Sequence, residues 1–486
     1  MLRRCLVLLS LLICMPAQAM PNEAALREVI GERIAASTAP GLMEIIDFRS
    51  MGQAPDPNGD ARIAYFSARL RLRQDHEFGA WDGQNLQALA TALGAGPRAI
   101  TGAKREGNRA GDVLRVNGAL RLREEAGRWV PLAAIPEGGS ATAFDSQGAR
   151  AERLLAAIGT ALTAGEQAAG GRVVPVIEQE LALAWRNIEA RQARLRNGLP
   201  LAGGAAGSEY ARLADAMVRL PSGPGLGRVI ALPSSGSVEN IRLLHEGTAA
   251  IAITQADVAL RAMRGGAAEW GIPGMPGLRA LAALYPEAVH VIVPATSAAR
   301  DMRALRGLPI GVGAKQSGAR VTAEDILASH GLDAASTPRI IIPPEEAATA
   351  LRSGRIAALI SVNLAPAQAI LRLADSVPIR ILALEEPAIE RLTRPEWGLT
   401  RLAIPARSYP QQTEAIPTVA TVATLVSPGT LTATEIAALL NRLFAGQGAA
   451  TDGGAAALMI QREHAKNTQP LPLHLAAERF FSMKTQ

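Results

Sequence analysis

The chain has 486 residues, of which 48% are hydrophobic, 19% are charged and 3% are aromatic. This length exceeds one ordinary hydrophobic core and the composition excludes bulk disorder, so two or three packed domains are expected. The formal net charge is +6, but the arginines are scattered among acidic residues and form no basic run. That pattern indicates a solvated surface and argues against nucleic-acid binding.

The first 19 residues have the features of a secretory signal. Two arginines precede an apolar run from Cys5 to Met15, and a small-residue Ala-Gln-Ala site ends at Ala19. The run is shorter than the roughly 20 residues that a membrane-spanning helix needs. We therefore expect a mature chain that begins at Met20, lies in the periplasm and is not membrane-spanning. A lipid-modified start at Cys14 is the alternative. Both cysteines lie in this segment, so the mature chain is predicted to lack disulfides and thiol-based sites.

A small α+β domain of unassigned role is predicted over residues 20–148. A helical pattern covers 21–41, and glycine-punctuated, alternating segments follow it. Alternation of apolar and polar residues predicts half-buried strands. The expected strands are 61–72, 113–122 and 128–132, with a short helix over 85–93 between the first two.

A long helical connector is predicted over residues 149–198. Ile177, Leu181, Trp185 and Ile188 recur at helical spacing and share one face. The segment fits a helix packed between two domains, or alternatively a coiled dimerisation element. Asn197-Gly198-Leu199-Pro200 ends it and marks a domain boundary.

From residue 199 to 486, short apolar runs alternate with helical patterns of about ten residues. This alternation predicts an α/β fold with doubly wound, largely parallel sheets. Two such lobes, with the chain crossing back near 418–426, are expected.

The stretch Arg228 to Leu260 reads as strand, polar turn, helix, strand and polar turn. In such βαβ units, ligands bind beyond the carboxyl ends of the strands, where helices begin. Ser235, Ser237 and Asn240 stand at the first helix start, and helix N-termini attract anions such as carboxylates. Plain helix capping by serine is the alternative. Gln255 and Asp257 open the next helix, where Asp257 could instead bind a ligand amine.

These residues resemble a known family. Ser-Gly-Ser-Val-Glu-Asn-Ile-Arg-Leu-Leu from Ser235, followed by Gly247 and by Thr-Gln-Ala-Asp-Val-Ala from Thr254, is similar to the signature of TAXI solute-binding subunits of TRAP transporters. Ala283 to Val291 and the loop Gly311 to Glu324 resemble later segments of that family. The matches together span roughly residues 199 to 460.

The resemblance implies a periplasmic-binding-protein fold of type II-like architecture, which closes on a small organic acid or amino acid and delivers it to TRAP membrane subunits. It places ligand contacts in three turns. The expected ligand-binding residues are Ser208, Tyr210, Ser235, Ser237, Asn240, Gln255, Asp257, Ser317, Gly318 and Arg320. The second loop departs from the family pattern, because Gln316 replaces a small residue and Ala319 replaces a threonine.

Other classes of protein are less well supported. Gln316 interrupts both a P-loop and a dinucleotide fingerprint in the loop after Gly311. The six histidines are dispersed, without zinc-like spacing or a Gly-x-Ser-x-Gly elbow, so we expect no enzyme, metal or cofactor. The alternative function is a periplasmic ligand sensor, or a partner-binding protein that has lost its transport cargo.

Overall fold

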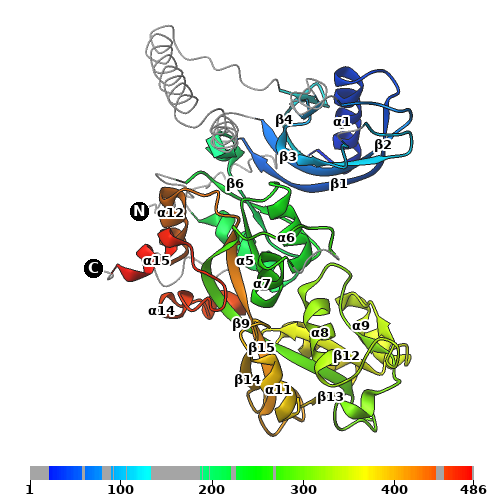
Figure 1. The fold of residues 1–486 in the computed structure, drawn as a ribbon, viewed down its shortest axis with the longest axis vertical. Helices are drawn as coiled ribbons and strands as arrows, with labels where there is room; N and C mark the ends of the chain where they lie inside the picture. Colours follow the sequence, from blue (N-terminus) through cyan, green and yellow to red (C-terminus); the bar gives the residue numbers. More distant parts are fainter. Residues whose placement is uncertain are drawn as a thin grey trace, which may run out of the picture.

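A computed structural model describes residues 21–483 apart from 57–60, 79–88, 91, 105–106, 133–186, 189, 196, 221–225, 266–269 and 445–453. The predicted signal peptide, Cys14, most of the predicted connector and much of the predicted helix 85–93 lie outside the described residues. The described parts form three bodies in a row, namely an N-terminal sheet domain and two α/β lobes (Figure 1).

The N-terminal domain, drawn in blue and cyan in Figure 1, packs one helix on an antiparallel sheet of order β1-β2-β4-β3, with β5 paired to β4. Its elements are α1 (Glu23–Ser37), β1 (Met43–Pro55), β2 (Arg62–Leu72), β3 (Ala95–Thr101), β4 (Val113–Glu125) and β5 (Arg128–Pro131). The Asn22 side chain caps α1 by accepting the Ala25 N–H at 2.9 Å. Strand β1 was not predicted, because two register shifts break its alternation.

Lobe I contains a parallel β7-β6-β8 unit with α5, α6 and α7 between and after the strands. Its elements are β6 (Leu199–Ala202), α5 (Glu209–Arg219), β7 (Val229–Leu232), α6 (Ser237–His245), β8 (Ile251–Gln255) and α7 (Ala256–Met263). The C-terminal helices α12 (Ala433–Phe444), α13 (Ala455–Leu458), α14 (Arg462–Ala465) and α15 (Leu475–Ser482) also belong to this lobe.

Lobe II contains a second parallel unit, β11-β10-β12. Its elements are β10 (Ile310–Gly311), α8 (Gly318–Ser329), β11 (Arg339–Ile340), α9 (Ala347–Arg352), β12 (Ala358–Asn363), α10 (Gln368–Ser376), β13 (Ile379–Leu382), α11 (Glu386–Leu392) and β14 (Thr400–Ile404). The sequence pattern predicts a helix over 298–306, but the structure has a single 3-10 turn there, Arg303–Leu305. Gly307, with a φ of +78°, follows this turn.

Two long strands, β9 (Arg279–Pro294) and β15 (Ile416–Ser427), run side by side from lobe I into lobe II (Figure 1). The two strands pair antiparallel with each other. In lobe I, β15 also pairs antiparallel with β8, and in lobe II, β9 pairs antiparallel with β12. The expected α/β fold with two lobes and a chain that crosses back is confirmed. The sheet is parallel at its two ends and antiparallel at its centre, because both crossing strands run through it in opposite directions.

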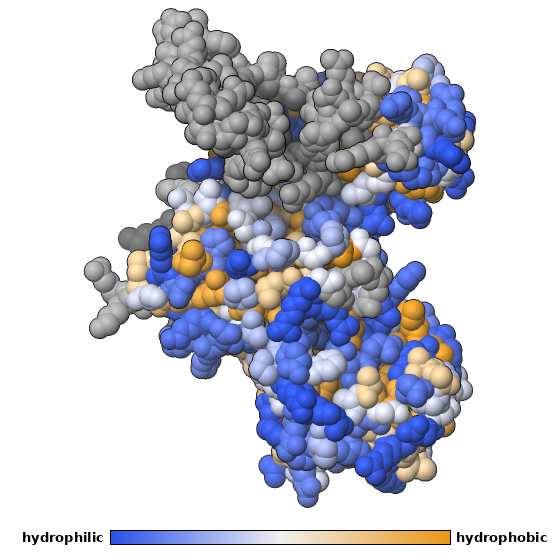
Figure 2. Space-filling view, viewed as in Figure 1, coloured by the Kyte–Doolittle hydropathy of each residue, from blue (hydrophilic) through white to orange (hydrophobic). Residues whose placement is uncertain are grey.

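The surface seen in Figure 2 mixes hydrophilic and hydrophobic residues over both lobes. Within the described part of the chain, no helix is long and apolar enough to cross a membrane.

Candidate functional site between the lobes

The crossing point of β9 and β15 carries a buried carboxyl group at the lobe junction. Glu287 of β9 faces Thr421 of β15 as a cross-strand pair, at the place where both strands leave lobe I. Glu287 is 6% exposed and accepts a hydrogen bond from the Tyr210 hydroxyl at 2.6 Å. Burial raises the pKa of Glu287 to about 8, the Tyr210 hydrogen bond opposes this shift, and the Asp257 and Glu209 carboxylates add to it.

A second buried carboxylate, Asp257, lies beside this pair at the start of α7. It accepts hydroxyl hydrogen bonds from Thr421 at 2.8 Å and from Thr322 of α8 at 2.6 Å. Burial raises its pKa, while the two threonine hydroxyls act in the opposite direction. Because α7 belongs to lobe I and α8 to lobe II, Asp257 joins the lobes at their junction.

Buried polar atoms without a hydrogen-bond partner also lie among the described residues of this region. Within the described residues, Gln255 Oε1 and the Tyr285 hydroxyl are enclosed and make no hydrogen bond. The Tyr285 ring stands edge-on to Tyr210, with ring centroids 6.5 Å apart. A buried polar atom without a hydrogen bond lowers the stability of the folded chain. A bound solute that makes the missing hydrogen bond would explain why such atoms are present.

The α6 turn lies against the loop that begins α8. The Val238 N–H donates to the Gln316 carbonyl at 3.2 Å, across the lobes. A Cβ on Gly236 would lie 3.0 Å from Ser317 Cα, and one on Gly318 would lie 1.8 Å from Gln255 Oε1. The two glycines therefore allow the turns to approach this closely.

The structure brings most of the predicted site residues together, in different roles. Ser208 and Ser317 cap their helices by accepting the Ala211 and Arg320 N–H groups, each at 3.2 Å. Ser237 does not cap α6; its hydroxyl accepts the Gln255 N–H at 3.2 Å. The Ser235 N–H donates to Glu239 at 2.6 Å. Arg320 points back to its own loop, where its Nε donates to the Lys315 carbonyl at 3.1 Å.

Asn240 is fully buried, and its side chain holds the ends of two strands. Its amide donates to the Gly203 carbonyl at 2.5 Å and to the Ile253 carbonyl at 2.7 Å. Both amide hydrogens are therefore engaged with the backbone, while the Asn240 Oδ1 is buried without a hydrogen-bond partner, so contact of this side chain with a solute stays a prediction.

Asn240→Ala should lower the free energy of unfolding by about 2–4 kcal/mol, because two buried carbonyls lose their donors. Urea denaturation measures the loss. The exposed Asn467→Ala is the matched control and should change stability by less than about 0.5 kcal/mol. A loss no larger than that of the control would contradict the structural role.

Sequence reasoning missed Glu287, Tyr285 and Thr421. Glu287 is the single Asp, Glu, Lys or Arg in the apolar run from Ala280 to Pro294, which is a usable signal, since a charge inside a buried strand requires a reason. No local pattern marks Thr421, whose role depends on pairing with β9 and on contact with α7.

The raised pKa of Glu287 makes stability depend on pH. Between its ordinary value of 4.5 and about 8, the unfolded chain has released this proton and the folded chain has kept it. The native state then binds more protons, so stability falls as pH rises through this window. Compared with Glu287→Gln, the wild type should lose roughly 1 kcal/mol per pH unit between pH 5 and pH 8.

Urea denaturation of both proteins at unit pH steps measures this difference. Glu414→Gln, at an exposed position, is the control and should follow the wild type at every pH. A constant difference between wild type and Glu287→Gln would show that Glu287 is ionised in the folded chain.

Two other features bear on the choice of site. Among the described residues, no group of three His, Cys, Asp or Glu side chains is placed to hold a metal ion. A groove of about 520 Å³ lies far from the lobe junction, between α1 and the start of β1. This groove is open, and its Arg27 guanidinium already donates a hydrogen bond to the Ile45 carbonyl at 2.9 Å. We therefore take the lobe junction, which has buried carboxyl and hydroxyl groups, as the candidate site.

The fold and the junction define a two-lobed α/β protein whose polar site lies where two strands cross between the lobes. Residues 201–483 match the NMT1-like family, and the chain belongs to that family.

Several solved structures are similar to this chain at low identity. The periplasmic aliphatic sulphonate-binding protein SsuA from Escherichia coli is 13% identical, with 58% of this chain and 83% of that chain covered and a TM-score of 0.32. A binding protein component of an ABC phosphonate transporter from Pseudomonas aeruginosa is 11% identical, with coverages of 54% and 79% and a TM-score of 0.35. A chloride-bound protein from Xanthomonas citri is 14% identical, with coverages of 58% and 94% and a TM-score of 0.35.

Proposed function

We propose that this chain is an exported solute-binding subunit of a TRAP-type transporter, which encloses a small amino acid between its lobes and delivers it to membrane subunits. The observation that carries the proposal is the buried cluster of Tyr210, Asp257 and Glu287 at the crossing strands, next to the α6 and α8 turns. Family membership and the TAXI-like signature from Ser235 to Ala259 support the assignment.

An amino acid fits this cluster better than a simple organic acid does. A carboxylate is favoured at helix N-termini, and α5, α6 and α8 all begin at the junction. An ammonium group has three donors, and Glu287, Gln255 Oε1 and the Tyr285 hydroxyl can accept them. A buried carboxylate without a cation is unfavourable, so a cationic group beside Glu287 would stabilise its charged form.

A panel of solutes tests the function. Thermal unfolding of the mature protein should be measured with each common amino acid, with matched carboxylic acids and amines, and with an alkanesulfonate and a phosphonate. At 100 times its dissociation constant a bound solute stabilises by about 2.7 kcal/mol. We expect at least one amino acid to do so, and its monofunctional analogues to have little effect. Stabilisation by the sulfonate or phosphonate alone, or by nothing, would contradict the proposal.

A periplasmic sensor or partner-binding protein is the second candidate. It is favoured by the N-terminal domain, whose residues share a hydrophobic core with lobe I, an arrangement that links the solute site to another surface. A solute-induced change in protection confined to the lobes would favour the transport subunit. A change that extends into β1 and β2 would favour the sensor.

A further inference from the structure

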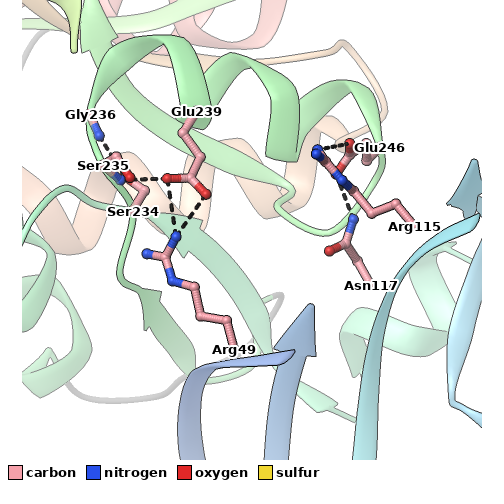
Figure 3. Close-up of polar contacts among 8 residues, drawn as sticks. All are labelled: Arg49, Arg115, Asn117, Ser234, Ser235, Gly236, Glu239 and Glu246. Atoms are coloured by element: carbon pink, nitrogen blue, oxygen red, sulfur yellow. Dashed lines mark hydrogen bonds and ion pairs between the residues drawn. The ribbon is translucent and has the colours of Figure 1, made fainter. Parts of the chain in front are cut away.

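Side chains of the N-terminal sheet form ion pairs and hydrogen bonds with residues at both ends of helix α6 (Figure 3). At the first end, Arg49 of β1 donates from Nη1 to the Glu239 carboxylate at 3.0 Å. At the second end, Arg115 and Asn117 of β4 donate to the Glu246 carboxylate at 3.2 and 2.5 Å. Two strands from a different part of the sequence thus contact α6 at its two ends, from the same side of the helix (Figure 3).

The same contact region is packed with apolar side chains. Met51 and Ala54 of β1 and Ile63 and Tyr65 of β2 belong to one hydrophobic cluster with α6 and the lobe I strands. Gly52 has a φ of +129°, and a Cβ there would lie 3.1 Å from the Ala231 carbonyl oxygen of β7. The N-terminal sheet and lobe I are therefore one packed unit. This packing fixes the positions of the strands whose side chains contact α6.

Glu239 connects these contacts to the turn from Ser234 to Ser237. Its Oε2 accepts the Ser235 N–H at 2.6 Å, and the Ser234 hydroxyl accepts the Gly236 N–H at 3.3 Å (Figure 3). A glutamate three residues into a helix that reaches back to the preceding backbone fixes the entry of the chain. Here its carboxylate is 13% exposed and is paired with an arginine from β1.

We propose that Arg49 is a positioning residue for the solute site, which acts through Glu239 to hold the Ser234–Ser237 turn. Arg49 orients the carboxylate that receives the Ser235 N–H, and it also neutralises a negative charge at the helix end where the solute carboxylate is placed. That this turn binds a solute rests on the proposed function, whereas the link from Arg49 through Glu239 to the turn rests on the observed contacts. This role of Arg49 gives the N-terminal domain a task in solute binding.

Hydrogen exchange of the solute-free protein tests the inference. In Arg49→Met, the Ser235 amide should exchange about 10-fold faster than in the wild type, because its acceptor loses its anchor. Arg71→Met is the matched control, since Arg71 makes an exposed 3.4 Å pair with Glu44 on the same sheet. It should leave the Ser235 amide unchanged, and the urea midpoint should stay unchanged in both variants.

A double-mutant comparison separates positioning from a general loss of packing. In a Glu239→Gln background, where the amide oxygen can still accept the Ser235 N–H, Arg49→Met should change the exchange rate less than 2-fold. Equal effects in both backgrounds, or an unchanged Ser235 amide in Arg49→Met, would overturn the inference. Because no solute is present, this result is independent of whether the panel identifies an amino acid.

Discussion

Gly318→Ala should prevent the two lobes from closing against each other. A Cβ at this position would lie 1.8 Å from Gln255 Oε1, 2.6 Å from the Gln255 amide carbon and 2.8 Å from Ser237 Oγ. Gln255 is 3% exposed, so its side chain has little space into which it can rotate. Gly318 begins α8, and alanine favours a helix, so the expected effect is a steric one across the lobes.

The Val238 amide reports closure directly, because it donates to the Gln316 carbonyl across the lobes. Its hydrogen exchange should accelerate by at least about 10-fold in Gly318→Ala. Removing the closest obstructing side chain in Gly318→Ala/Gln255→Ala should restore part of the slow exchange, since Ser237 Oγ still lies 2.8 Å from the added Cβ. Gly31→Ala in α1 is the control, since a Cβ there meets only Ile45 at 4.0 Å. An unchanged Val238 amide in Gly318→Ala would contradict the observed contact between the turns.

Arg194→Met should be the most destabilising of the substitutions considered. Arg194 and Glu435 form a buried ion pair, with side chains 7% and 5% exposed and Nε 2.8 Å from Oε1. Although burial opposes it, hydrogen bonds from Arg194 and Thr432 hold the pKa of Glu435 below its ordinary value. Removing one partner of such a pair leaves an uncompensated buried charge and costs about 3–5 kcal/mol.

Urea denaturation at pH 7 measures that loss. The double variant Arg194→Met/Glu435→Met should recover most of it, because neither charge then remains buried. Loss of less than about 1 kcal/mol in Arg194→Met would show that the pair is solvated. The outcome also bears on the proposed boundary at residue 198. We expect a fragment that begins at Asn197 to be less stable than one that retains Arg194.

The strands and helices of the lobes could be predicted from the sequence because each is a short local pattern. The run Val229 to Leu232, its polar turn and the helix ended by Gly247 follow from periodicity and from turn residues. Strand β1 was missed because Gly52 and two register shifts interrupt its alternation. The antiparallel centre of the sheet could not be predicted, since the direction in which β9 and β15 pair is a long-range property.

The sequence predicts where the candidate site lies better than it predicts which side chains contact one another there. Gln255 and Asp257 were predicted because they follow a strand end, where α/β folds bind ligands, and Tyr210 was predicted from the family resemblance. Their partners, Glu287 and Thr322, come from other elements, and the contacts between them depend on how the lobes meet. The structural role of Asn240 could not be predicted, because a polar residue near a helix start looks the same in sequence whether it faces solvent or crosslinks two strands.

The central claim is that the lobe junction receives an ammonium group beside Glu287, whose carboxyl group is protonated before the solute binds. Calorimetry of the most stabilising amino acid at pH 7, in phosphate and in Tris buffer, tests it most directly. A carboxyl group with a pKa of about 8 holds its proton at pH 7, and pairing with an ammonium group should release it to the buffer. We predict release of nearly one proton in the wild type, seen as a dependence of the binding heat on the buffer, and none in Glu287→Gln. A binding heat that is the same in both buffers, or an equal proton release in Glu287→Gln, would contradict the account.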